Sequence, residues 1–212
     1  MILYCVRHGE TTYNVQRRLQ GHSQRSALSP LGRRQSEAVA AALADKPIEA
    51  IYASPLRRAL ETAVIVAQAL RLEIRTDPRL REINVGVFQD QLRADLEKHQ
   101  PEALARWLSG DPDYVIPGGE SRRQLAARGR EALEAIRRSG HRQVVVVSHG
   151  GLLVSTIKSL LGIPLADPPL ALENCSITTL DWPDDGGVEL AALDQVGHLA
   201  AVGHGGIGDL AV

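Results

Sequence analysis

The feature that most constrains this chain is the alternation of short apolar runs with longer helical stretches. Residues 2–6, 50–53 and 143–148 have the composition of buried strands, and a helix-like stretch comes later after each of them. Ser29-Pro30 and Ser54-Pro55 each place a serine before a proline, which is a favoured order at a helix N-terminus. This alternation predicts an α/β fold in which a mostly parallel sheet carries helices on both faces.

The other expected elements complete one domain over residues 1–202. Further helices are expected from residue 121 to a stop at Gly140 and from Gly150 to about Gly162, and further strands at residues 73–76, 176–182 and 188–193. Prolines and a glycine interrupt residues 90–120, so this segment is expected to be irregular or to form short helices that cover a site. Residues 203–212 are rich in glycine and are predicted to be a flexible tail.

Composition excludes several classes of protein. Lys and Arg number 24 and Asp and Glu 25, so no overall basic field exists to bind nucleic acid or an acidic membrane surface. No apolar run approaches the roughly 20 residues of a membrane span, and no export signal is visible, so a cytoplasmic protein is expected. Cys5 and Cys175 lie in apolar stretches and are expected to be buried thiols rather than a disulfide.

Polar residues follow three of the predicted strands. The first strand leads into Arg7-His8-Gly9-Glu10, the second into a helix with Arg57 and Arg58 in its first turn, and the third into His149-Gly150-Gly151. Ligands of open α/β sheets bind beyond the carboxyl ends of the strands. We therefore expect a locally cationic edge with two histidines in a protein that is not basic overall.

Such an edge suits phosphate chemistry. Arginine binds phosphate oxygens through two parallel N–H groups, and helix N-termini add further donors. A histidine among arginines has its pKa lowered, stays neutral, and can attack phosphorus, while a second, protonated histidine would stabilise the transition state. The leaving oxygen needs a proton, and Glu82 is the best candidate donor because it precedes the covering segment. The alternative is that Glu82 merely pairs with Arg79 or Arg81.

Five sequence blocks carry a resemblance to a known family. In chain order they are Arg7-His8-Gly9-Glu10-Thr11 with Asn14 and Gln20-Gly21, Ser54-Pro55-Leu56-Arg57-Arg58-Ala59 with Thr62, Leu80-Arg81-Glu82-Ile83 with Gly86, Pro117-Gly118-Gly119-Glu120-Ser121, and Val147-Ser148-His149-Gly150-Gly151. These blocks resemble the motifs of the histidine phosphatase superfamily, in its phosphoglycerate mutase-like branch. Five blocks in the right order are far more specific than one tripeptide.

The resemblance implies a three-layer α/β/α sandwich, no metal or other cofactor, and a role for each matching residue. His8 would be the phosphorylated nucleophile, and Glu82 would be the proton donor and then the base. The phosphate pocket would include Arg7, Asn14, Gln20, Gly21, Arg57, Glu82, His149 and Gly150. The partner would be a small phosphomonoester, whose identity would depend on Gln20, His22, Val85, Phe88 and the covering segment.

Three functions fit these residues. The first is a metal-independent phosphatase, and the second is a cofactor-dependent phosphoglycerate mutase that uses the same site. Glu82 and His149 are only 67 positions apart, which leaves a short cover and favours water as the phosphoryl acceptor. The third is a protein that binds phosphate without catalysis, which retention of every expected site residue disfavours. Exposed edge strands make a homodimer a further expectation.

Overall fold

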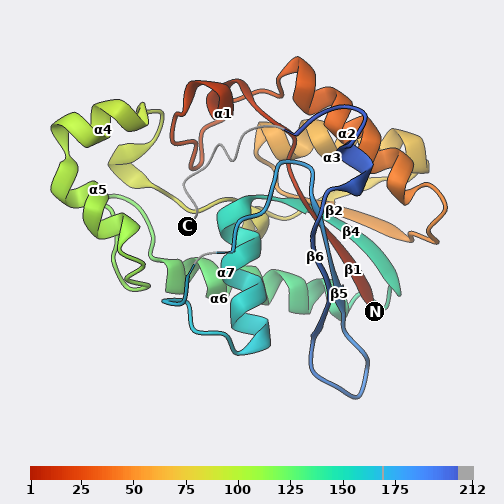
Figure 1. Ribbon diagram of the computed structural model, residues 1–212. Helices are drawn as coiled ribbons and strands as arrows, with labels where there is room; N and C mark the ends of the chain where they lie inside the picture. Colours follow the sequence, from red (N-terminus) through yellow and green to blue (C-terminus); the bar gives the residue numbers. More distant parts are fainter. Residues whose placement is uncertain (169, 205–212) are drawn as a thin grey trace.

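The computed structural model describes residues 1–168 and 170–204 and contains one central sheet (Figure 1). The strand order is β3-β2-β4-β1-β5-β6. The strands are β1 (Ile2–Arg7), β2 (Ala50–Ala53), β3 (Ile74–Thr76), β4 (Gln143–Ser148), β5 (Ile177–Asp181) and β6 (Glu189–Gln195). The first four strands in that order pair in parallel, and β5 and β6 are antiparallel to their neighbours. The predicted fold, with its mostly parallel sheet, is confirmed.

Helices cover both faces of this sheet because the strands bury alternate residues on each side. On β1, Tyr4 and Val6 belong to the core under one pair of helices, whereas Leu3 and Cys5 belong to the core on the opposite face. The first pair is α2 (Pro30–Leu43) and α3 (Arg57–Leu70), and the second is α6 (Arg122–Arg137) and α7 (Gly150–Leu161). Figure 1 shows the two pairs on either side of the strands. The result is the expected three-layer sandwich.

The helix starts match the sequence expectations in part. Ser29 caps α2 as predicted, since its hydroxyl accepts the Gly32 N–H at 3.0 Å. The same prediction for Ser54 was wrong, because α3 begins only at Arg57 and its N-cap residue Leu56 offers no side-chain bond. The Ser54 hydroxyl instead contacts the ring of His149. One short helix, α1 (Thr12–Gln16), was not expected from the sequence.

The predicted covering segment is a set of short helices. Residues 90–120 contain α4 (Arg93–His99) and α5 (Pro101–Leu108), and the 3₁₀ turns η1 (Pro78–Leu80) and η2 (Gly86–Phe88) come before them. The rings of Phe88 and Trp107 pack edge to face with centroids 6.3 Å apart, and both side chains are buried. Phe88 therefore anchors the cover internally, although the sequence suggested it as a residue that selects the substrate. Figure 1 shows α4 and α5 as one lobe at the left, next to α1.

Other parts of the chain bear on the remaining expectations. Cys5 and Cys175 are free, buried thiols as predicted, and burial raises the pKa of each to about 12. Among the described residues, none of the helices has the length and apolar character needed to cross a bilayer. After η3 (Gly197–Leu199), the predicted flexible tail from residue 205 onward lies outside the described residues.

Candidate active site

The two histidines come together because β1 and β4 are neighbouring parallel strands. Arg7 pairs with Ser148 at the carboxyl ends of these strands, so His8 and His149 follow side by side. After β1 the chain passes through the short helix α1 and then enters α2 on one face of the sheet. After β4 it continues directly into α7 on the other face. The chain thus leaves the two strands toward opposite faces, which is the point where open α/β sheets have their ligand-binding crevice. The ring centroids of His8 and His149 lie 5.2 Å apart at this point.

His8 is fully buried, and its ring is oriented by bonds at both nitrogens. Nδ1 lies 2.8 Å from the carbonyl oxygen of Gly9, which can only accept a hydrogen bond. Arg58 Nε donates to Nε2 at 3.2 Å, and a guanidinium N–H cannot accept. The proton of the neutral ring therefore resides on Nδ1, and Nε2 presents a lone pair. In this tautomer the Nε2 lone pair of His8 lies beside the guanidinium group of Arg58.

The arginine beside His8 is Arg58, and not Arg57 as the sequence suggested. Arg58 is 1% exposed and also donates from Nη2 to the Gly21 carbonyl at 2.9 Å. The Arg57 side chain is 51% exposed and bound to Glu61 at 2.8 Å. Successive helical residues point about 100° apart, so only one of the two arginines can face the site. Arg58 shares the buried face with Thr62 and Val66, a spacing of four that could have identified it.

Arg7, at the end of β1, is the second buried arginine of the site. Its side chain is almost completely buried, and Nη1 donates to the carbonyl of Leu172. A Cβ atom at Gly150 would lie only 3.4 Å from Arg7 Nε, so the guanidinium lies directly against the start of α7. Arg7 and Gly150 are therefore brought to the same place, as the sequence predicted.

His149 is the N-cap residue of α7 and is also fully buried. Its Nε2 lies 2.8 Å from the Ser54 hydroxyl, and its Nδ1 has no hydrogen-bond partner. Burial above all, and then the positive charge of Arg58, holds the pKa of His149 well below 6.5. The sequence suggested a protonated second histidine, whereas burial of His149 favours its neutral form. Its unpartnered Nδ1 is a buried polar atom that a ligand could satisfy.

Glu82 reaches the same crevice from the segment between η1 and η2. Its carboxyl oxygens accept the N–H groups of Gly151 at 3.0 Å and Leu152 at 2.9 Å, both in the first turn of α7. A Cβ atom at Gly151 would lie 2.6 Å from Glu82 Oε1, so any larger residue there would displace the carboxyl group from this position. Arg79, one of the two alternative partners that the sequence offered for Glu82, binds Asp77 at 2.7 Å.

The predicted polar residues Asn14, Gln20 and Gly21 lie on the loop that contains α1. Asn14 Oδ1 accepts from the Thr11 backbone at 3.0 Å, and Gln20 Oε1 accepts from Ser26 Oγ at 2.7 Å. Gly21 has a φ of 48°, and its carbonyl binds Arg58. The bonds of Asn14 and Gln20 link parts of the loop to one another. The bond from Arg58 to the Gly21 carbonyl holds the loop against the arginine of the site.

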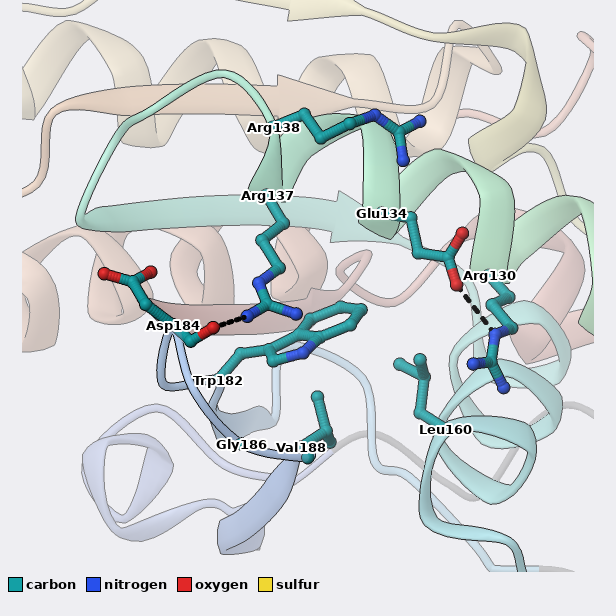
Figure 2. A pocket seen from close by; sticks show the side chains of 10 residues that line it. Arg130, Glu134, Arg137, Arg138, Leu160, Trp182, Asp184, Gly186 and Val188 are labelled. Atoms are coloured by element: carbon teal, nitrogen blue, oxygen red, sulfur yellow. Dashed lines mark hydrogen bonds and ion pairs between the residues drawn. The ribbon is translucent and has the colours of Figure 1, made fainter.

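A separate hollow of about 530 Å³ is lined by α6, the end of α7 and the residues that follow β5 (Figure 2). Arg137 stacks on Trp182 there, with its guanidinium carbon 4.9 Å from the ring centroid, and donates to the carbonyl of Asp184. Arg130 is bound to Glu134 at 2.8 Å. Arg137 thus binds the turn after β5, and Arg130 binds a neighbouring residue of its own helix. The residues that line this hollow include no histidine. The crevice around His8 is therefore the better candidate site.

Comparison with known proteins agrees with this geometry. Residues 3–195 match the family model described as the histidine phosphatase superfamily, branch 1. A probable phosphoglycerate mutase GpmB from Proteus mirabilis is 41% identical over 182 residues, which are 85% of this chain and 84% of that protein. The named sequence relative is therefore a probable mutase.

Solved structures of phosphatases are also similar. Mycobacterial glucosyl-3-phosphoglycerate phosphatase is 34% identical with a TM-score of 0.82, over 91% of this chain and 98% of that one. YhfR of Bacillus stearothermophilus is 31% identical with a TM-score of 0.86, over 93% and 98% of the two chains. The family match covers nearly the whole sequence and includes every block on which the site is built. This chain belongs to the histidine phosphatase superfamily, branch 1.

Proposed function

We propose that this protein is a phosphatase that hydrolyses a small phosphomonoester through a covalent phosphohistidine on His8, without a metal ion. The observation that carries the proposal is the hydrogen bonding of the His8 ring, with Gly9 at Nδ1 and Arg58 at Nε2. A neutral imidazole whose Nε2 lone pair lies beside a guanidinium is suited to attack a phosphorus atom whose oxygens that guanidinium binds.

In the first step the Nε2 lone pair of His8 attacks phosphorus, and the bond from phosphorus to the ester oxygen breaks. The protonated carboxyl of Glu82 gives its proton to that oxygen, so the alcohol leaves in neutral form. Arg7 and Arg58 stabilise the negative charge of the transferring group. His149 presents Nδ1 as its unpartnered atom, and a bound dianion would raise the pKa of this histidine and favour its protonated form.

In the second step a water molecule attacks the phosphohistidine. The Glu82 carboxylate accepts a proton from this water, the N–P bond breaks, and inorganic phosphate leaves. His8 recovers its lone pair and Glu82 its proton, so the cycle consumes one ester and one water and yields one alcohol and one phosphate. The electrostatic work is divided among arginine and histidine side chains, which is why we propose that no metal is needed.

A mutase is the second candidate, and the similarity to a protein named a probable phosphoglycerate mutase favours it. A mutase must keep water away while the phosphoryl group returns to its substrate. The segment from 90 to 120 that was expected to cover the site contains two helices of only 7 and 8 residues, α4 and α5. We propose hydrolysis because so short a cover leaves access for water, and because the similar mycobacterial structure is named a phosphatase.

The experiment is an assay of phosphate release in EDTA from phosphoserine, 3-phosphoglycerate, glucosyl-3-phosphoglycerate and p-nitrophenyl phosphate. Conversion of 3-phosphoglycerate to 2-phosphoglycerate is followed in parallel. Release without isomerisation supports the phosphatase, and the order of kcat/KM values ranks the substrates. Isomerisation without release would establish the mutase. The absence of both, together with no phosphohistidine after acid-free quenching, would leave only phosphate binding.

A further inference from the structure

A single side chain on α6, Arg128, binds the segment that carries Glu82. Its Nη1 donates to the carbonyl of Arg79 at 2.8 Å and to that of Arg81 at 2.6 Å. Its Nη2 donates to the carbonyl of Glu82 itself at 2.7 Å. One guanidinium thus binds three main-chain carbonyls within four residues of the chain.

A carboxylate completes this arrangement. Glu120 binds Arg128 through both oxygens, Oε2 to Nε at 3.0 Å and Oε1 to Nη2 at 2.6 Å. Glu120 Oε1 also accepts the N–H of Asn84 at 2.7 Å, and the Glu120 N–H donates to the Asn84 carbonyl at 2.9 Å. Arg128 and Glu120 together, which we name the Arg128–Glu120 clamp, therefore hold the chain on both sides of Glu82.

The segment needs such a clamp because it has no regular secondary structure. Residues 81–85 form neither helix nor strand, so no ladder of main-chain bonds fixes their position. The fork of an arginine can satisfy several carbonyls at once in a fixed plane, which a lysine cannot do. The side chains of Arg128 and Glu120 are largely buried, at 21% and 16% exposed, so the carboxylate of Glu120 is needed to balance the charge of the guanidinium.

We propose that Arg128 and Glu120 are positioning residues for proton transfer by Glu82, an inference that rests on the proposed phosphatase mechanism. Neither side chain needs to touch the substrate. The clamp fixes the position of the Glu82 main chain relative to the first turn of α7, where the Glu82 carboxyl group is bound. A displacement of the donor by about 1 Å costs on the order of 100-fold in rate, because proton transfer requires hydrogen-bond geometry.

The test separates a displaced proton donor from a general loss of structure. The p-nitrophenolate ion leaves readily without a proton, whereas the alkoxide of phosphoserine does not. The value of kcat/KM covers only the steps up to departure of the alcohol, so later hydrolysis of the phosphohistidine does not enter it. The readout is the ratio of kcat/KM for p-nitrophenyl phosphate to that for phosphoserine, or for whichever alkyl ester the wild type hydrolyses best.

We expect Arg128→Gln to raise this ratio about 100-fold and Arg128→Lys to raise it less. The matched control is Arg130→Gln, which removes another arginine from the same helix. Arg130 binds Glu134 at the surface, so this variant should leave the ratio unchanged. If Arg128→Gln fails to fold, Glu120→Gln decides, with an expected rise of roughly tenfold.

Equal losses on both esters, or an unchanged ratio in folded Arg128→Gln or Glu120→Gln protein, would overturn the positioning role. A failure of the proposed function is read separately. It would be seen in the wild-type protein, as absence of hydrolysis of either ester, before any variant is compared.

Discussion

Replacing Arg58 by alanine is expected to cripple phosphoryl transfer, whereas replacing its neighbour Arg57 is expected to have little effect. Arg58 is 1% exposed and its Nε lies 3.2 Å from the nitrogen that we propose as nucleophile. The Arg57 side chain is 51% exposed and bound to Glu61 on the next turn of the same helix. The two residues have the same chemistry and adjacent positions, so each is a control for the other.

The size of each effect follows from its surroundings. Removing one well-placed donor to a developing negative charge costs about 2.7–4 kcal/mol, or about 10²–10³-fold in kcat. A guanidinium that binds the transferring oxygens belongs in that class. The surface pair of Arg57 and Glu61 contributes about 0.3–0.5 kcal/mol to stability and nothing to the chemistry. We therefore expect Arg57→Ala to change kcat/KM by less than about twofold.

The assay is kcat/KM for p-nitrophenyl phosphate in EDTA, with circular dichroism and thermal melting to establish that each variant is folded. Arg58→Ala leaves a hollow beside His8, so Arg58→Lys is measured as well. It keeps the charge but loses the two parallel donors, and should fall between the wild type and Arg58→Ala. A folded Arg58→Ala protein with wild-type activity, or an equal loss in Arg57→Ala, would refute the assignment of Arg58.

Three further variants test the rest of the site. His8→Ala should stay folded and lose turnover together with the phosphohistidine; residual turnover above a trace would exclude His8 as nucleophile. Gly151→Ala should lower kcat/KM for an alkyl ester about 100-fold, because the new methyl group would lie 2.6 Å from Glu82 Oε1, and wild-type activity would contradict this requirement. The lowered pKa of His149 means that the unfolded chain binds a proton which the folded one excludes. The free energy of unfolding should therefore be highest above about pH 6.5 and should fall as the pH drops below this value. The urea midpoints at about pH 8 and pH 5 should differ less in His149→Gln than in the wild type. An equal difference in the two proteins would show that His149 does not cause the loss of stability.

Most of the fold and much of the site could be predicted because their signals are local. Short β-branched runs mark β1, β2 and β4, and in a parallel sheet the residues that follow such strands meet at one edge. His8 and His149 could therefore be placed together although about two thirds of the chain separates them. Arg7 and Gly150 follow from the same reasoning, because each adjoins one of these histidines.

The resemblance placed Arg57 in the phosphate pocket, whereas the structure brings Arg58 to the ring of His8. Ser54 and Pro55 indicate a helix that begins at residue 55, whereas α3 begins two residues later. A helix start uncertain by two residues leaves the direction of the first side chains undetermined. The buried face formed by Thr62 and Val66 would have resolved it, since only Arg58 lies on that face.

Long-range contacts of side chains with the main chain could not be predicted. Nothing local indicates that Arg128 binds the carbonyls of a segment nearly fifty residues earlier, or that Ser54 contacts the ring of His149. Such bonds depend on how the layers meet, and on which main-chain groups the secondary structure leaves without a partner. The sequence could suggest Glu82 as a candidate proton donor, but it could not indicate which side chains bind the segment that carries Glu82.

The first turn of α7 binds the carboxyl group of Glu82, which was not expected from the sequence. Helix N-termini were expected to bind the phosphate directly. The first N–H groups of α7 instead donate to the Glu82 carboxyl, at Gly151 and Leu152. If phosphate binds without displacing Glu82, its charge must be met by side chains, chiefly Arg7, Arg58 and His149. The helix then serves the proton donor and the arginines serve the phosphoryl group, so loss of Arg58 should impair binding and transfer of every ester, whereas displacement of Glu82 should matter most for esters whose alcohol leaves poorly.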